Sequence, residues 1–271
     1  MGISVLMSIY KKEKPEYFRE TMESILAQTR QPEEIVLIED GTLTPELDAV
    51  IEEYQKRCSN LKVYPHKENQ MLGRALAEGV TLCSYELIAR MDTDDISKPN
   101  RCEKQLQAFD DDDSLDIVGG NINEFIGDVN NVVSKRNVPK NNGDIKEYMK
   151  KRCAFNHMTV MFKKSSVEDA GGYLDLFWNE DYYLWIRMWM NGAVFANTGT
   201  ALVDVRVGNE MYQRRGGSKY FASEKKLQNY MLEHQMISFP TYFVNLSKRF
   251  IIQKLMPGKL RGWVFRKFAR A

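Results

Sequence analysis

The side chains with the clearest chemical potential are two aspartates, Asp92 and Asp94, which directly follow the apolar segment at residues 86–91. A buried strand that ends here delivers carboxylates at alternate positions, and such a pair can hold a hard divalent cation. Mg²⁺ characteristically takes one or two carboxylates together with phosphate oxygens of a substrate. The alternative is that Asp94 and Asp95 merely cap a turn before Pro99. Spacing alone does not decide between these two interpretations.

A second acidic pair, Glu180 and Asp181, begins an amphipathic segment that runs to Asn191. Acidic residues are common in the first turn of a helix because the helix dipole favours them there. The same dipole lowers the pKa of a carboxylate and keeps it ionised, as a general base must be. The pair is therefore either a simple consequence of helix formation or a candidate general base.

These acidic pairs need a scaffold, and strand and helix signals alternate through the first half of the chain. Apolar runs predict strands at residues 3–9, 34–39, 61–65 and 86–91, and apolar periodicity with proline-led first turns predicts helices at 15–29, 44–57 and 72–83. This alternation indicates right-handed βαβ units, and hence an α/β fold with a mostly parallel sheet. The second half predicts extended segments at 117–125, 129–133, 159–162 and 201–207, a helix at 180–191, and helical structure beyond residue 217.

Polar residues gather where the predicted strands end, which is where open α/β sheets bind their ligands. They are Ser8 and Tyr10 after the first strand, Glu39 and Asp40 after the second, and Asp92, Asp94 and Asp95 after the fourth. Asp40 either belongs to an ordinary turn with Gly41 or accepts hydrogen bonds from a nucleotide base. Arg74 is either a surface arginine or a group that reaches a pyrophosphate at a helix N-terminus.

Composition excludes several classes of protein. The 271 residues are 43% hydrophobic and 28% charged, which is a globular profile. No apolar run has the length of a membrane span, and the N-terminus resembles a buried strand more than a signal peptide. The four cysteines form no CxxC pair, which argues against a zinc site or a disulfide framework and favours a reducing, cytoplasmic location.

The charge is distributed unevenly along the chain. Residues 241–271 contain eight Lys or Arg and no Asp or Glu, so a mildly acidic body carries a basic tail. Because this tail also contains Trp and Phe, it suits an anionic membrane surface. The alternative is a helix that packs on the rest of the chain or on a second subunit. Nucleic-acid binding is disfavoured because the remaining residues are acidic.

Five segments of the chain resemble family 2 glycosyltransferases of the GT-A fold, in particular the bacterial enzymes that build capsule, exopolysaccharide or lipopolysaccharide O-chains. The segments are SVLMSIYKKEKPEYFRETMESILAQTRQPEEIVLIEDG, LGRALAEGV, ELIARMDTDDISKPNRCEKQ, HMTVMFKKSSVEDAGGY and NEDYYLWIRM. The resemblance implies a Rossmann-like, mostly parallel open sheet flanked by helices, forming a GT-A catalytic domain at residues 1–210. A helical, basic C-terminal extension would occupy residues 211–271.

The resemblance also implies roles for individual residues. The donor-binding residues would be Ser8, Tyr10, Glu39, Asp40, Arg74, Asp92, Thr93 and Asp94. Asp92 and Asp94 match the DxD motif, which binds Mn²⁺ or Mg²⁺. Asp181 would be the general base, with Glu180 as an alternative base or as a group that positions the acceptor. The family's QxxRW motif is absent and VDVRVGNEMYQRRGG takes its place, so the roles of Arg206, Arg214 and Arg215 stay open.

The function that the resemblance implies is inverting sugar transfer from a nucleotide-sugar, a UDP-sugar because Asp40 matches the family's uracil contact. The acceptor would be a hydroxyl of a growing, lipid-linked bacterial surface glycan, reached from the inner face of the membrane. One alternative is a sugar nucleotidyltransferase, which would need a glycine-rich loop after the first strand, but SIYKKEKPEY contains no glycine. Another is an inactive, membrane-associated protein that binds sugar nucleotides. The oligomeric state is open.

Overall fold

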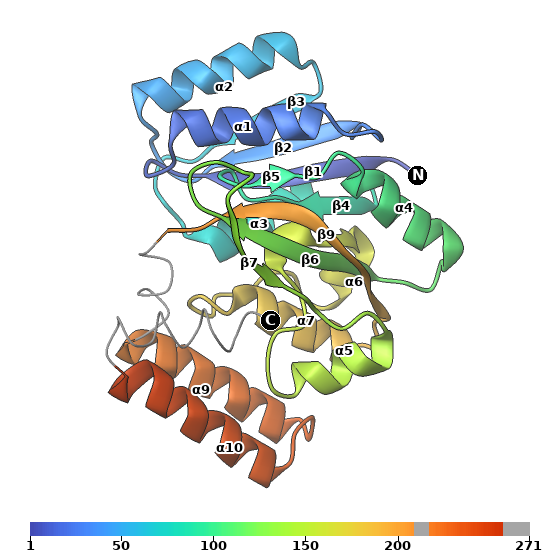
Figure 1. The fold of residues 1–271 in the computed structure, drawn as a ribbon, viewed down its shortest axis with the longest axis vertical. Coiled ribbons are helices and arrows are strands. Elements are labelled where there is room, and N and C mark those ends of the chain that lie inside the picture. Colours follow the sequence, from blue (N-terminus) through green and yellow to red (C-terminus); the bar gives the residue numbers. More distant parts are fainter. Residues whose placement is uncertain (209–216, 257–271) are drawn as a thin grey trace.

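The computed structural model describes residues 1–208 and 217–256, and within these ranges nine strands form one open sheet with helices on both faces (Figure 1). The strand order is β3-β2-β1-β4-β8-β6-β9-β5, and β7 pairs with β6. Arg214, Arg215 and residues 257–271 of the basic tail lie outside the described residues.

The first half of the sheet is a parallel α/β unit. Its elements are β1 (Ile3–Ile9), α1 (Pro15–Leu26), β2 (Glu34–Glu39), α2 (Pro45–Arg57), β3 (Leu61–Pro65), α3 (Leu72–Leu82) and β4 (Leu87–Arg90). β1 pairs in parallel with both β2 and β4, and β2 pairs in parallel with β3. The predicted strands and helices of this half are confirmed, with differences only at their ends. All four strands therefore present their carboxyl ends at one edge of the sheet.

The second half of the sheet is mixed. Its elements are β5 (Ile96–Ser97), α4 (Arg101–Asp111), β6 (Ile117–Phe125), β7 (Val132–Arg136), α5 (Asn142–Met149), η1 (His157–Thr159), β8 (Met161–Lys163), α6 (Lys164–Asp169), α7 (Glu180–Met190) and β9 (Phe195–Arg206). β6 and β9 are parallel, whereas β8 is antiparallel to both β4 and β6. The parallel pattern expected from the βαβ units therefore stops at β4, where β8 enters the sheet in the opposite direction.

Three extended segments of this half differ from the prediction. β7 begins at Val132 rather than at residue 129, because Asp128 and Asn131 close a turn through a 2.9 Å backbone hydrogen bond. Thr159 belongs to the short helix η1, and β8 starts only at Met161. β9 begins at Phe195, well before residue 201, because its half-polar start pairs with β6.

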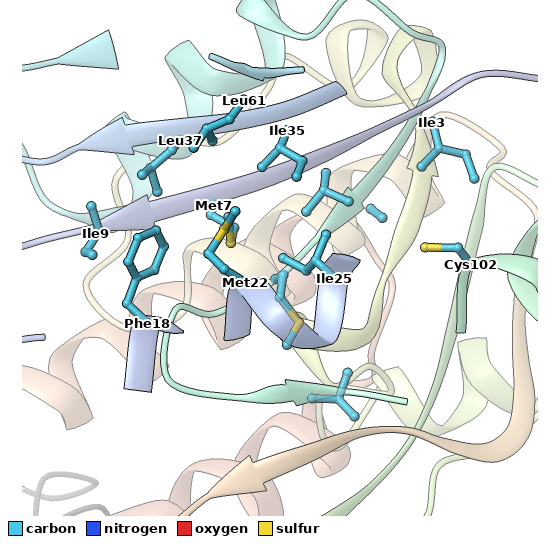
Figure 2. Close-up of a cluster of buried hydrophobic side chains, with 14 of the residues drawn as sticks. Ile3, Met7, Ile9, Phe18, Met22, Ile25, Ile35, Leu37, Leu61 and Cys102 are labelled. Atoms are coloured by element: carbon cyan, nitrogen blue, oxygen red, sulfur yellow. The ribbon is translucent and has the colours of Figure 1, made fainter. Parts of the chain in front are cut away.

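Two buried clusters, one on each face of the sheet, hold the fold together. Alternate residues of β1 point to opposite faces, so Met7 and Ile9 pack under α1 while Leu6 packs against α3. Figure 2 shows Ile9 beside Phe18 of α1 and Met7 close to Met22. Because β1 is covered on both faces, it reads as a continuous apolar run in the sequence.

The last described segment consists of α9 (Ser218–Glu233), α10 (Phe239–Phe250) and η2 (Ile251–Leu255), which confirms the predicted helical structure beyond residue 217. α9 and α10 lie side by side at the end of the molecule opposite α1 and α2 (Figure 1). Arg249 of α10 pairs with Glu224 of α9 at 2.6 Å. Asn245 of α10 donates a hydrogen bond to the Lys150 carbonyl at 2.8 Å, which fixes the two helices to the segment that follows α5. None of the described helices is long and apolar enough to span a membrane.

Candidate active site

Asp92, the first aspartate after β4, forms an ion pair with a buried arginine. Arg90 is the last residue of β4, and its Nη2 lies 2.5 Å from Asp92 Oδ1. The Arg90 side chain is 2% exposed whereas that of Asp92 is 32% exposed. The arginine is therefore part of the core, and the carboxylate that it fixes opens to solvent at the edge of the sheet.

Glu13, a residue that sequence reasoning missed, joins the same edge. Thr93 Oγ1 donates a 2.8 Å hydrogen bond to Glu13 Oε2, which connects the segment after β1 to the segment after β4. Burial raises the pKa of Glu13, and the nearby charge of Asp92 adds to this effect. Glu13 escaped notice because it sits in the charge-rich run KKEK, which has the composition of a solvated loop. Its place after the carboxyl end of β1 was the available signal.

Asp94 lies among the other negatively charged groups of this edge. Burial raises its pKa to about 7, and the charges of Asp92 and Glu13 push it in the same direction. Among residues 1–208 and 217–256, no group of three or more His, Cys, Asp or Glu side chains is arranged to hold a metal ion by itself. The oxygen donors of Asp92 and Asp94 fit a hard cation that takes its remaining ligands from a diphosphate.

Asp95, the third aspartate of the segment, has a structural role. It is 1% exposed, and its Oδ1 accepts a 2.9 Å hydrogen bond from the backbone N–H of Arg206. Burial raises the pKa of Asp95 well above its ordinary value. Arg206 Nε in turn donates to the Asp94 carbonyl at 3.2 Å, and the guanidinium stacks on the Tyr17 ring at 3.9 Å. These contacts brace the aspartate segment against the end of β9.

The residues predicted to contact the nucleoside lie at the ends of β1 and β2. Ser8 is half-buried on β1 and Tyr10 beyond it is 39% exposed, and Ile9 pairs directly with Glu39 of β2. Burial raises the pKa of Glu39, and the charge of Asp48 adds to the shift. The parallel register thus brings these polar residues to the same edge as the aspartates after β4.

Asp40 organises the loop that leads to α3. Its carboxylate is buried and accepts hydrogen bonds from the Gln70 backbone N–H at 2.6 Å and from Asn69 Nδ2 at 2.8 Å. The neighbouring Gly41 has φ of +89°, and a Cβ there would lie 2.7 Å from the Asn69 nitrogen. Only glycine fits both requirements. The turn at Asp40 therefore fixes the position at which α3 begins.

The second acidic pair, Glu180 and Asp181, stands at the start of α7. Burial raises the pKa of Glu180 to about 7, and repulsion from Asp181 adds to the shift. Burial also raises the pKa of Asp181. The expectation that the helix dipole would lower these pKa values is wrong, because the loss of hydration outweighs the dipole. The pKa of each carboxyl thus lies above its ordinary value, which makes each a stronger proton acceptor once it is ionised.

The start of α3 meets the start of α7. A Cβ on Gly73 would lie 3.4 Å from Glu180 Cβ, so the two first turns are in contact. The predicted donor-contact residue Arg74 pairs with Asp175, with both Nε and Nη2 at 2.8 Å from Oδ2. The structure thus places Arg74 beside the acidic pair of α7, tied to the loop that precedes it.

Two further buried residues connect the acidic pairs. The Tyr173 hydroxyl is close enough to Asp92, Glu180 and Asp181 for all three charges to act on it, although burial is the main cause of its raised pKa. The charge of Arg90 lowers the pKa of both Glu180 and Asp181. Arg90 and Tyr173 are therefore coupled by charge to the carboxylates after β4 and to those of α7. Neither residue type stands out in the sequence, because their convergence depends on contacts between distant segments.

His157 is half-buried and packs beside Tyr173. Its Nε2 lies 2.9 Å from the Tyr173 hydroxyl, and burial, with Arg90 nearby, lowers its pKa well below the ordinary value. The imidazole is therefore neutral, and its contact with the Tyr173 hydroxyl holds that side chain in position.

Comparison with known proteins identifies the family. The model of "Glycosyl transferase family 2" matches residues 4–169. An uncharacterized glycosyltransferase of Haemophilus influenzae is 47% identical over 227 residues, which cover 84% of each chain. The Escherichia coli enzyme UDP-Gal:alpha-D-GlcNAc-diphosphoundecaprenol beta-1,3-galactosyltransferase is 36% identical over 267 residues, which cover 98% of this chain and 96% of the relative.

Solved structures share the fold at low sequence identity. S. aureus TarS in complex with UDP-GlcNAc superposes with a TM-score of 0.68 at 17% identity, covering 98% of this chain and 79% of TarS. The mannosyltransferase PcManGT from Pyrobaculum calidifontis, in complex with GDP-Man and Mn²⁺, gives a TM-score of 0.63 at 12% identity, covering 97% of this chain and 73% of that one. The acidic edge described above is thus set in a known architecture, and the chain belongs to glycosyl transferase family 2.

Proposed function

We propose that this glycosyltransferase moves a sugar from a UDP-sugar to a hydroxyl of a lipid-linked bacterial surface glycan, with inversion at the anomeric carbon. One observation carries the proposal: the buried Arg90 pairs with Asp92 after β4, and its charge also acts on Glu180 and Asp181 at the start of α7. The E. coli relative, whose name specifies a UDP-sugar donor and a diphosphoundecaprenol-linked acceptor, supports the choice of substrates.

The donor would lie over the parallel half of the sheet. Ser8, Tyr10, Glu39 and Asp40 would line the nucleoside site, Arg74 would lie near the diphosphate, and Asp92, Thr93 and Asp94 would face the diphosphate and its cation. Asp92 and Asp94 would hold Mn²⁺ or Mg²⁺, and the oxygen-only donor set suits either ion. When bound, the ion supplies Lewis-acid stabilisation of the charge on the leaving nucleoside diphosphate.

The acceptor would approach from the side of α7. Asp181 removes the proton from the attacking hydroxyl, and Glu180 either shares this role or positions the acceptor. Attack from the face opposite the leaving group inverts the anomeric configuration. The raised pKa values of both carboxyls match this task, because a carboxylate with a raised pKa holds a transferred proton more firmly than an ordinary one.

Peripheral association with an anionic membrane surface would bring the enzyme to a lipid-linked acceptor. α10 exposes apolar side chains at Phe239, Phe243, Val244 and Phe250, and Ile251 at the start of η2 is also exposed. The exposed Lys248 and Lys254 lie in the same segment, and residues 257–271 add further basic residues without an acidic one. This combination of aromatic and basic side chains is typical of helices that lie in a membrane interface.

The proposal is tested by thermal-shift screening of the full chain against UDP- and GDP-sugars with Mn²⁺ or with a chelator. A UDP-sugar that stabilises the protein only with the ion is then assayed for transfer to prenyl-diphosphate-linked sugars. NMR of the product gives the anomeric configuration. Retention of configuration, or transfer that proceeds unchanged in the chelator, would contradict the mechanism proposed here.

A further inference from the structure

A cavity of about 320 Å³ opens beside the acidic pair of α7, and no role is assigned to it by the function proposed above. Its walls come from the loop that precedes α7, with Asp175 and Phe177, and from α9, with Lys219, Ser223 and Lys226. The α9 residues are separated by four, three and seven positions, so they share one face of that helix. The cavity therefore lies where the loop that precedes α7 meets α9.

Two contacts hold α9 against the loop that precedes α7. Asn179, directly before the acidic pair, donates a hydrogen bond from Nδ2 to Ser223 Oγ at 3.0 Å, and both side chains are buried. The Trp178 ring meets the Tyr220 ring edge to face, with centroids 5.8 Å apart. The lysine-bearing face of α9 is thus held against the loop that delivers the candidate base.

The cavity lies next to the reacting end of the site. A Cβ on Gly73 would be 3.4 Å from Glu180 Cβ and 3.7 Å from Asp175 Oδ1, so the cavity wall and the acidic pair touch the same residue. The cavity wall and Glu180 are therefore both within contact distance of Gly73, which places a ligand in the cavity near the acidic pair.

The charge inside the cavity is positive. Lys219 and Lys226 are exposed, and neither makes an ion pair with any residue in the parts of the chain that the structure describes. Asp175 already pairs with Arg74 at 2.8 Å, so its negative charge is compensated from outside the cavity. Two ammonium groups without an ion-pair partner among the described residues suit an anion that carries more than one charge.

An aromatic surface lies between the cavity and the acidic pair. The rings of Phe177 and Trp178 stack with centroids 4.4 Å apart and remain 38% and 43% exposed. Trp178 has φ of +60°, a conformation that non-glycine residues rarely adopt and that turns this exposed residue out just before α7. Such exposed rings can cover the apolar face of a sugar.

We infer that this cavity binds the diphosphate of the acceptor, with Lys219 and Lys226 as its cationic contacts and the Phe177–Trp178 stack against the acceptor sugar. The inference rests on the proposed function and specifies where its acceptor lies. In the acceptor named for the E. coli relative, the sugar is joined directly to a diphosphate. A diphosphate bound in the cavity would hold that sugar next to residues 177–181, from where a hydroxyl of the sugar could reach Asp181.

The test compares Lys219→Ala/Lys226→Ala with Lys225→Ala, an exposed lysine of the same helix that does not line the cavity. Two acceptor probes are used with the full chain: GlcNAc linked through a diphosphate to a short prenyl chain, and an alkyl GlcNAc glycoside without phosphate. The double variant should raise KM for the diphosphate probe by roughly tenfold or more. KM for the UDP-sugar and turnover of the alkyl glycoside should stay unchanged, and Lys225→Ala should behave as the wild type.

Direct binding separates this inference from the proposed function. Calorimetry with the prenyl-diphosphate sugar measures the affinity of the cavity without requiring transfer. Calorimetry with UDP and Mn²⁺ measures the affinity of the donor site. Loss of affinity for the first ligand alone in the double variant supports the cavity as the acceptor subsite. Unchanged affinity, or an equal loss for UDP, overturns it. If the wild type binds the diphosphate probe but transfers no sugar, the proposed function fails while the subsite stands.

Discussion

Arg90 lies buried beneath Asp92, with Nη2 2.5 Å from Oδ1, and it is the cation that both acidic pairs of the site share. Its Nε and Nη1 are buried without a hydrogen-bond partner among the described residues. Its charge also lowers the pKa of Asp94, Glu180 and Asp181 against the opposing effect of burial. An arginine in the core thus offsets the repulsion that would otherwise push these carboxylates apart.

Replacing Arg90 should therefore destabilise the protein and also remove the ion pair that fixes Asp92. Arg90→Met and Asp92→Asn should each lower the free energy of unfolding, the first by roughly 1–3 kcal/mol, because each leaves a charged partner uncompensated. The double variant should lose less than the sum of the two, as measured by urea unfolding in a double-mutant cycle. Strict additivity would show that the pair is not coupled. Arg101→Met is the control, because Arg101 is equally buried but donates to the Arg90 carbonyl at 2.6 Å instead of pairing with Asp92.

Asp181→Asn should abolish transfer while donor binding survives. The amide keeps the size and the position of the side chain but cannot accept a proton from the acceptor hydroxyl. The transfer rate should fall at least about a hundredfold, and calorimetry should give an unchanged affinity for UDP with Mn²⁺. A variant that turns over at a rate near that of the wild type would exclude Asp181 as the base and transfer the role to Glu180.

Asp92→Asn combined with Asp94→Asn should remove the assistance that a divalent cation gives to nucleotide binding. Titration of UDP should show an affinity that rises with Mn²⁺ in the wild type and does not in the double variant. Asp95→Asn is a poor control because Asp95 braces the backbone of Arg206. Asp110→Asn, in the exposed acidic run at the end of α4, is a suitable one. Metal-assisted affinity that survives in the double variant would contradict the assigned role of the pair.

Glu180→Gln should make the protein more stable at alkaline pH although it impairs the enzyme. The pKa of Glu180 rises from 4.5 to about 7 on folding, so the folded state binds a proton more firmly than the unfolded state. The free energy of unfolding therefore falls as pH rises through this window, and the penalty is complete above it. The variant should gain roughly 1–2 kcal/mol over the wild type at about pH 8 and little at about pH 4.5, as measured by thermal unfolding. A gain that does not depend on pH would point to packing rather than charge.

Phe239→Ser combined with Phe243→Ser should weaken binding to anionic vesicles. These rings are 65% and 62% exposed on α10, so the substitutions remove apolar surface without opening the core. Flotation with phosphatidylglycerol liposomes should show about a tenfold lower bound fraction, and neutral liposomes should bind both forms poorly. Val132→Ser/Val133→Ser on β7 removes comparably exposed apolar side chains elsewhere and should float as the wild type does. Equal flotation of all three proteins would defeat membrane association through α10.

Local sequence signals were sufficient for the parallel half of the fold. The apolar run at residues 34–39 and the Thr44–Pro45 start of α2 are determined by neighbours in the sequence, and both elements lie where they were predicted. β9 was recognised only in part, because its first residues, FANTGT, are polar and bend at Gly199, which has φ of +73°. Pairing with β6 makes that segment a strand, and such long-range pairing leaves no local pattern.

In the candidate site, too, local sequence signals reveal some residues, whereas long-range contacts define the others. Asp92, Asp94, Glu180 and Asp181 could be found because acidic pairs at element ends are visible in a sequence. Glu13, Arg90 and Tyr173 could not, since each gains its role from a contact with a distant segment. The pKa values of the α7 pair were misjudged for a related reason, because burial by packed neighbours outweighs the local helix dipole.

β4 separates two regions of the sheet that differ in strand direction, with β1 parallel on one side and β8 antiparallel on the other. The residues proposed to recognise the donor lie mostly on the first side, and α7, α9 and the lysine-lined cavity lie beyond residue 169, where the match to the family model ends. The part of the chain proposed to hold the acceptor therefore lies outside the residues that define the family, so substitutions there would change the glycan that is extended without altering the donor site.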